Sequence, residues 1–242
     1  MPEASVEPLI KHRWDINIQE AKKLQCELAG NLRFCPFPIR KVKTVAAVDV
    51  SYSRFDKTGY AVLGIFEVEQ NDIEKRFEIK KYDIFEHVDR VNFPYVPGYL
   101  SFREIPILLP LFRQISVKPD VILVDGAGIA HPRGIGLASH IGVIFDTATI
   151  GCAKSRLVGE YTEPDKTKGS YSPLFFNGKK VGVVVRSKDG VKPLFISPGN
   201  RIDIKSSTEV ILRFCSRYRL PDPIRLIDMR TKALRKELQK NG

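Results

Sequence analysis

Three acidic residues occupy positions at which an ionised carboxylate is costly. Asp49 lies within "VAAVDVSY", Glu104 lies within "LSFREIPILL", and Asp125 ends the apolar run "VILVDG". A carboxylate among apolar side chains is very unfavourable unless it is paired or binds a metal. A convergent set of Asp and Glu without cysteine suits a hard cation with oxygen ligands, Mg²⁺ or Mn²⁺. On a basic protein, this chemistry indicates metal-assisted hydrolysis of a phosphodiester bond.

Each of these acids also has a simpler interpretation. Asp49 at a strand edge would reach solvent, Asp125 would begin a turn before Gly126, and Glu104 would pair with Arg103. These separate explanations become less convincing when the three acids are considered together, because ligand sites of α/β sheets cluster at the carboxyl ends of parallel strands. If the first strand, the helix and the fourth strand meet there, the three carboxylates converge on one point.

The elements that must position these acids follow from the hydrophobic pattern. Three β-rich runs separated by turn residues predict antiparallel strands over 43–53, 59–70 and 74–86. The run over 99–115 has helical spacing, and Pro106 and Pro110 predict a break or kink in that helix. A continuous apolar run over 118–126 predicts a buried parallel strand.

The remaining elements complete an alternating pattern. They are a helix around 16–30, a helix over 136–146, a strand over 148–154, a hairpin formed by 178–187 and 192–199, and helices near 206–217 and 228–240. The order predicts a single α/β domain over 1–242, with its core at about 40–220. The expected fold is a ribonuclease H-like mixed sheet, in which three antiparallel strands precede parallel strands and helices flank the sheet.

Charge and composition narrow the class of partner. The 242 residues contain 39 Lys and Arg against 28 Asp and Glu, a formal net charge of +11 that is spread along the chain. Such an excess favours polyanionic partners, although it also serves solubility. No run of about 18 apolar residues or signal-peptide pattern is present, and four scattered cysteines do not form a zinc motif. We expect a cytoplasmic monomer that does not bind membranes.

Four sequence blocks together resemble the endonuclease V family. They are "VAAVDVSYS", "PYVPGYLSFRE", "LVDGAGIAHPRGIGLASHIGV" and "GCAKSRLVG", and the resemblance covers most of residues 44–215. It implies a ribonuclease H-like fold and a Mg²⁺-dependent endonuclease, for which Mn²⁺ can substitute. The implied reaction nicks DNA at the second phosphodiester bond 3′ to deoxyinosine and leaves 3′-hydroxyl and 5′-phosphate ends.

The resemblance also implies roles for individual residues. Asp49, Glu104 and Asp125 match the metal-binding catalytic carboxylates of the family, and Lys154 in "AKSRL" would place a positive charge beside the scissile phosphate. His131 in "GIAHPR" would lie near the catalytic site or contact phosphate. A structural hydrogen-bonding role for His131 stays open, and we expect a structural role for His140.

The stretch "PYVPG" resembles the family's wedge, a side chain that fills the gap left by an extruded base. Tyr95 would be inserted into the strand, and Pro94 and Pro97 would stiffen the loop before it meets DNA. The alternative is a Pro-rich surface turn with an incidental tyrosine. A set of small or apolar residues at matching positions would line a hypoxanthine pocket: Gly98, Leu100, Gly126, Gly128 and Leu157. Gly126 and Gly128 could instead be turn glycines.

The sequence departs from the family pattern in two places. Asn200 stands in "SPGNRIDI" where the family usually has a histidine thought to assist near the metal site, and Gly134 follows "HPR" where a larger residue is common. An asparagine cannot act as an acid or base near neutral pH.

Two rival functions stay open: an endoribonuclease for inosine-containing RNA and a non-catalytic binder of damaged DNA. The basic "TKALRKELQK" near the C-terminus could contact the DNA backbone or be a solvated helix, and we expect the solvated helix.

Overall fold

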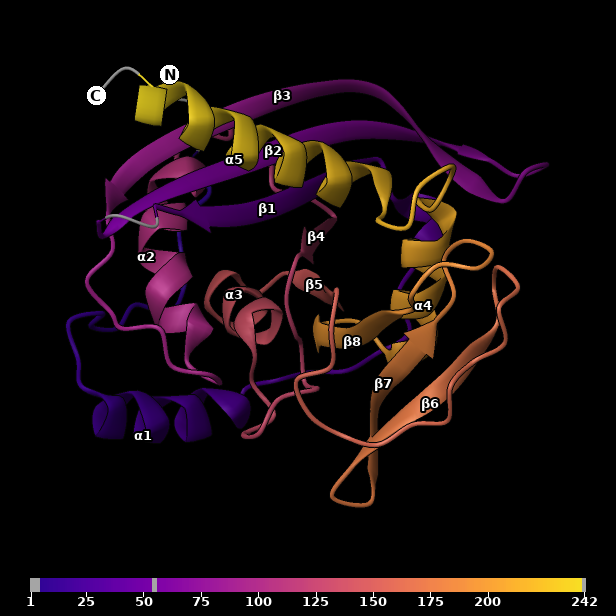
Figure 1. Ribbon diagram of the computed structural model, residues 1–242, viewed down its shortest axis with the longest axis horizontal. Coiled ribbons are helices and arrows are strands. Elements are labelled where there is room, and N and C mark those ends of the chain that lie inside the picture. Colours follow the sequence, from indigo (N-terminus) through magenta and orange to yellow (C-terminus); the bar gives the residue numbers. More distant parts are fainter. Residues whose placement is uncertain (1–4, 54–55, 241–242) are drawn as a thin grey trace.

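The computed structural model describes residues 5–53 and 56–240. Eight strands form a mixed sheet in the order β3-β2-β1-β4-β5-β8-β7-β6 (Figure 1). Their bounds are β1 Thr44–Tyr52, β2 Thr58–Asn71, β3 Arg76–Arg90, β4 Val121–Val124, β5 Ala148–Ala153, β6 Tyr171–Phe176, β7 Lys179–Val185 and β8 Leu194–Asn200. The strands β1 to β3 pair antiparallel, and β4 and β5 continue the sheet in parallel with β1. The expected mixed-sheet fold is therefore confirmed.

The far half of the sheet contains a strand that the sequence pattern did not predict. The expected hairpin is present, because β7 pairs antiparallel with β8, but β7 also pairs antiparallel with β6. This strand contains Pro173 within "YSPLFF", and proline cannot donate a ladder hydrogen bond. The strand exists because β6 is the outermost strand of the sheet, where proline is tolerated.

Five α-helices and one 3₁₀ turn complete the described chain. They are α1 Ile18–Ala29, α2 Leu100–Phe112, α3 Leu137–Phe145, α4 Ile204–Arg213, α5 Asp222–Lys240 and the turn Ile39–Lys41. Of the break or kink expected in α2, the break is absent, because the helix runs unbroken through Pro106 and Pro110. Each proline removes one i→i−4 hydrogen bond, but burial of Phe102, Ile105 and Leu108 in the core holds the helix together.

The helices cover both faces of the sheet, as the alternation of side chains along β1 requires. Val45 and Ala47 pack in a core that includes residues of α4 and α5, whereas Ala46 and Val48 pack with α2 and α3. Figure 1 shows α5 lying along the strands β1 to β3. The expected solvated helix over 231–240 is present on its outer side, where Lys232, Lys236 and Glu237 are exposed, but Thr231 and Leu234 are buried in the core.

The N-terminal segment before α1 lies against α3. The amide groups of Leu9 and Ile10 donate to the carbonyl of Ile144, and Trp14 stacks on the ring of His140 at 5.4 Å. His140 is fully buried, and its Nε2 lies 2.9 Å from Nε2 of His12. These contacts give His140 the structural surroundings expected of it. No helix within residues 5–53 and 56–240 has the length and apolar character needed to cross a membrane.

Candidate active site

Asp49 and Asp125 are brought together by the parallel register of β1 and β4. Val48 pairs with Val124, so the next residue on each strand is an aspartate. Both side chains are half-buried, and Asp49 lies on the α5 side of the sheet, where Thr231 Oγ1 donates to its Oδ2 at 2.6 Å. The sequence placed an acid at each of these positions, and the register makes them neighbours.

Glu104 reaches the same region from α2. Its side chain is buried, and the hydroxyl of Tyr52 donates to its Oε1 at 3.0 Å. The guanidinium of Arg103 lies 4.2 Å from the centre of the Tyr52 ring and donates to the carbonyl of Phe93 at 2.7 Å. Arg103 therefore contacts the residue that holds Glu104, and it does not form the simple ion pair with Glu104 considered from the sequence.

Lys154 links two acids immediately after β5. Its Nζ lies 2.5 Å from Oδ2 of Asp125 and 2.5 Å from Oδ1 of Asp228. Asp228 comes from α5, and its Oδ2 also pairs with Lys232 one helical turn later at 2.6 Å. The candidate site thus contains four carboxylates from four elements, together with one shared lysine.

Asp228 and Thr231 were not identified from the sequence. A usable signal exists in α5, where Ile224, Ile227, Thr231 and Leu234 are buried with helical spacing. Asp228 directly follows Ile227 and is itself buried, so it stands beside this buried stripe. A buried acid such as Asp228 needs a hydrogen-bond or ionic partner, whereas the exposed charged residues of the same helix do not.

The protonation equilibria reflect crowding of negative charge. Burial raises the pKa of Asp49 and of Asp125, and nearby carboxylates add to the effect. Glu104 has a pKa well above its ordinary value, first because of burial and then because of Asp49. Burial disfavours the charged form of Lys154, but Asp125 and Asp228 outweigh it and raise the lysine pKa. The site therefore holds excess negative charge that a cation would offset.

The donor set fits a hard divalent cation by its chemistry. Oxygen atoms of carboxylates are the ligands that Mg²⁺ and Mn²⁺ prefer. Across the described ranges 5–53 and 56–240, no three His, Cys, Asp or Glu side chains are arranged as a preformed ligand shell. Each carboxylate is held by a donor from the protein: Thr231 for Asp49, Tyr52 for Glu104 and Lys154 for Asp125.

The loop before α2 presents Tyr95 to solvent. Its side chain is 72% exposed, while Phe93 and Tyr99 on either side are buried in a small core with Phe102. A large aromatic residue that projects from a loop anchored at both ends has little backbone freedom. Glu104 follows on the helix that starts at the end of this loop, so the exposed tyrosine and a site carboxylate belong to one continuous unit.

Gly98 ends this loop with a left-handed backbone, and its carbonyl accepts three hydrogen bonds. Its φ is 80°, a conformation that favours glycine. The donors are Nε2 of Gln25 at 3.1 Å, Nε2 of His131 at 2.9 Å and the guanidinium of Arg133. These three side chains, named here the Gly98 clamp, tie the tyrosine loop to α1 and to the loop after β4.

Both ring nitrogens of His131 form hydrogen bonds within the protein. Its Nδ1 accepts from the amide of Arg133 at 3.2 Å, which leaves the ring proton on Nε2 for the Gly98 carbonyl. Burial lowers the pKa of His131 to about 4. At neutral pH the ring is uncharged with both nitrogens occupied, and these contacts match the structural alternative considered for this histidine.

The same geometry predicts an acid sensitivity that His131→Gln removes. The folded pKa of about 4 lies below the ordinary value of 6.5, so the unfolded chain binds the proton more readily. The contribution of His131 to stability is complete above pH 6.5 and is lost as the pH falls toward 4, about 3 kcal/mol in total. Glutamine can donate to Gly98 without titrating, so the free energy of unfolding of the variant should fall less steeply over this range.

Denaturant unfolding of both proteins at a series of pH values measures this difference. His87→Gln, at a half-buried position of β3, is the matched control for replacing a histidine by glutamine outside the Gly98 clamp. Parallel curves for the wild type and His131→Gln would show that the clamp histidine is not responsible for the acid sensitivity.

The residues expected to line a base pocket have mixed surroundings. Leu157 is 44% exposed, and Leu100 and Gly126 are half-buried. Gly128 is buried against β8, where a Cβ atom would lie 2.1 Å from the carbonyl oxygen of Pro198. That contact explains the glycine by backbone packing. Gly134 has a φ of 68° and open space around it.

Asn200 does not lie with the carboxylates. It pairs with Thr149 near the start of β5, whereas Lys154 follows the end of the same strand. Its side chain is buried, accepts from the amide of Arg33 at 2.9 Å and donates to the carbonyl of Gly142 at 2.8 Å. The expectation that this position assists the metal site is therefore not supported, and Asn200 joins the end of β8 to α3 and to the segment that follows α1.

Known proteins are similar to this chain in both sequence and fold. The sequence model of the Endonuclease V family matches residues 27–229. Endonuclease V of Dictyoglomus turgidum is 40% identical over 216 residues, which are 89% of this chain and 90% of the relative. The crystal structure of Endonuclease V from Streptomyces avermitilis aligns with a TM-score of 0.83 at 33% identity, covering 98% of this chain and 100% of that one.

A further similar structure contains nucleic acid. Endonuclease V of Ciona intestinalis aligns with a TM-score of 0.74 at 27% identity, covering 93% of this chain and 99% of that one. That protein was crystallised with a 24mer DNA containing an inosine followed by a ribo-adenosine. The similarity extends over nearly the whole of both chains.

Proposed function

This chain belongs to the endonuclease V family, and from that premise we propose that it is a Mg²⁺-dependent DNA repair endonuclease, with Mn²⁺ able to substitute. It would nick the strand at the second phosphodiester bond 3′ to deoxyinosine and leave 3′-hydroxyl and 5′-phosphate ends. The observation that carries the proposal is the meeting of four carboxylates and Lys154 from separate elements in one crowded, negatively charged site.

Asp49, Glu104 and Asp125 would hold the metal ion, and Asp228 adds a fourth acid beside them. When bound, the ion supplies positive charge that neutralises the phosphate and lowers the pKa of the attacking water. Water attacks the phosphorus atom and the bond to O3′ breaks, so the phosphate remains on the 5′ side of the next nucleotide. Lys154 would place a compact positive charge beside the scissile phosphate.

The protein would open the duplex with the loop that carries Tyr95. Extruding a nucleotide costs a few kcal/mol of unstacking, and a rigid aromatic side chain that fills the gap offsets part of this cost. Pro94, Pro97 and the Gly98 clamp support such a wedge, because they restrict the loop before DNA arrives. We propose that Gly98, Leu100, Gly126, Gly128 and Leu157 surround the extruded hypoxanthine.

The test is nicking of an end-labelled duplex that contains one deoxyinosine, with Mg²⁺ and with a chelator instead. We expect a Mg²⁺-dependent nick one nucleotide beyond the inosine and no nick in the duplex with adenine at that position. Inosine-selective binding without cleavage in Mg²⁺ or Mn²⁺ would contradict the enzyme proposal and favour a binder of damaged DNA.

A second candidate is cleavage of inosine-containing RNA. The ribo-adenosine that follows the inosine in the Ciona complex shows that the related protein accommodates a 2′-hydroxyl next to the lesion. The same nicking assay with a single ribonucleotide after the inosine, and with an all-RNA strand, ranks the substrates. Faster cleavage of the RNA strand would make the endoribonuclease the better description.

A further inference from the structure

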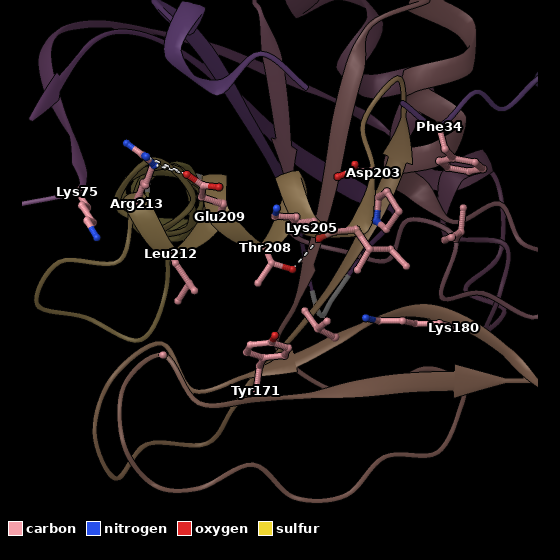
Figure 2. A pocket seen from close by; sticks show the side chains of 15 residues that line it. Phe34, Lys75, Tyr171, Lys180, Asp203, Lys205, Thr208, Glu209, Leu212 and Arg213 are labelled. Atoms are coloured by element: carbon pink, nitrogen blue, oxygen red, sulfur yellow. Dashed lines mark hydrogen bonds and ion pairs between the residues drawn. The ribbon is translucent and has the colours of Figure 1, made fainter. Parts of the chain in front are cut away.

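A large groove lies between α4 and the hairpin of β6 and β7 (Figure 2). Its volume is about 960 Å³, and none of its lining residues belongs to the candidate active site. Much of its wall is apolar and is formed by Phe34, Ile129, Tyr171, Val183, Pro198 and Leu212. A hollow of this size with exposed apolar surface is typical of a binding site.

The charges at the groove are positive once its internal pairs are counted. Glu209 pairs with Arg213 at 2.8 Å, whereas Asp203, which caps α4 by accepting from the amide of Ser206 at 2.6 Å, has no cationic partner among the described residues and keeps its negative charge. Three exposed lysines remain at the groove without an ion pair within residues 5–53 and 56–240: Lys75, Lys180 and Lys205. The groove therefore favours an anionic ligand.

Two exposed aromatic rings line the groove, each on firmly held backbone. Tyr171 is 61% exposed and begins β6, where it pairs with Val185 of β7. Phe34 is 49% exposed and directly follows Arg33, whose amide donates to the side chain of Asn200. Figure 2 shows Tyr171 on the hairpin side, facing α4, and Phe34 toward one end of the groove.

We propose that this groove is a second nucleic-acid site that holds a single-stranded segment. Aromatic rings on which bases stack, combined with unpaired lysines that contact phosphates, are the elements of single-strand binding. A duplex would not use the rings, because its base faces are already stacked. The proposal deepens the proposed function, since it gives the nuclease a grip on unpaired nucleic acid apart from the lesion.

Binding of a fluorescein-labelled oligothymidylate of about ten nucleotides, followed by anisotropy without divalent metal, tests the site. The groove variants are Tyr171→Ala and the triple replacement of Lys75, Lys180 and Lys205 by Ala. The matched controls are Tyr171→Phe, which keeps the ring, and a triple replacement of Lys11, Lys43 and Lys81 by Ala. These control lysines are exposed, do not line the groove and remove the same charge.

We expect Tyr171→Ala to weaken binding at least about fivefold, and Tyr171→Phe to keep it. The groove triple variant should lower the slope of log affinity against log salt by about 2, which is about 0.7 for each of the three lost phosphate contacts. Unchanged binding by the groove variants, or an equal loss in the control triple variant, would overturn the proposal. So would an acidic, leucine-containing peptide that binds in a Tyr171-dependent way while oligothymidylate does not, which would assign the groove to a protein partner.

Nicking assays separate this site from the proposed function. On a short blunt duplex with one deoxyinosine, the groove variants should nick at the rate of the wild type. Tyr95→Ala should slow nicking and leave oligothymidylate binding intact, because Tyr95 is not part of the groove. Failure of the wild type to nick, combined with Tyr171-dependent binding, would reject the proposed function and retain the groove.

Discussion

Replacing Asp49 by Asn should abolish nicking and at the same time stabilise the fold. The variant loses a proposed metal ligand, and we expect the single-turnover rate on the deoxyinosine duplex to fall by about 10³-fold or more. The amide still accepts the hydrogen bond of Thr231 but carries no charge. Calorimetric titration with Mn²⁺ should show weaker binding in parallel with the lost rate.

The stability change follows from the direction of the pKa shift. Burial raises the pKa of Asp49 above its ordinary value of 3.8, so the ionised form is disfavoured in the folded protein. The penalty is absent below the unfolded pKa and develops as the pH rises through the folded pKa. In metal-free buffer at neutral pH, Asp49→Asn should therefore raise Tm, by about 2–4 °C for each kcal/mol relieved.

Asp83→Asn, at an exposed position of β3, is the control for loss of a negative charge. It should change neither the nicking rate nor Tm appreciably. A Tm for Asp49→Asn below that of the wild type would mean that Asp49 is a stabilising structural acid, and full nicking activity would remove it from the active site.

Asp228→Asn should also impair nicking, but with the opposite effect on stability. Burial disfavours the charged form of Asp228, yet its hydrogen bonds to Lys154 and Lys232 outweigh this and lower its pKa. Its contribution to stability is present above the unfolded pKa of 3.8 and is lost as the pH falls through the folded pKa. The variant should lose about 2 kcal/mol at neutral pH, which is the scale of a hydrogen bond to a charged group.

We expect Asp228→Asn to lose activity because Lys154 then has one acidic partner instead of two. Without Asp228, Lys154 pairs with Asp125 alone and neutralises an acid that the metal ion requires. We expect a 10- to 100-fold weaker apparent affinity for Mg²⁺, the usual cost of changing a residue that supports a metal ligand. Titrating Mg²⁺ in the nicking assay measures this shift.

Asp222→Asn, in the first turn of the same helix, is the matched control. Asp222 lies 3.8 Å from Arg225 and takes no part in the site, so its variant should require no additional Mg²⁺. If Asp228→Asn behaves like this control, the fourth carboxylate serves only to anchor α5.

The N-terminal and C-terminal segments show why the local sequence pattern alone did not predict tertiary contacts. The segments around Trp14 and Asp228 looked uninformative as sequence, because an amphipathic or mixed stretch does not reveal what it packs against. In the fold, Trp14 covers His140, and α5 brings Asp228 to Lys154. Both are contacts between residues more than 70 positions apart, so they depend on how whole elements pack.

The amino-acid sequence by itself determined seven of the eight described strands, and it singled out the acids at the ends or inside two of them. Alternating and continuous apolar runs predict burial locally, so an acid inside such a run stands out, as at Asp49 and Asp125. The stiffness of the loop around Tyr95 was also readable, because proline and glycine restrict the backbone wherever they occur, but its interpretation as a wedge came from the resemblance to the endonuclease V family.

Only the tertiary structure decided how these parts act on one another. The parallel register of β1 and β4 sets Asp49 beside Asp125, and the packing of α5 adds Thr231 from 182 residues away. The Gly98 clamp likewise joins residues separated by 33 to 73 positions. Such contacts arise from burial of apolar faces between elements, a global condition that the periodicity of one segment does not contain.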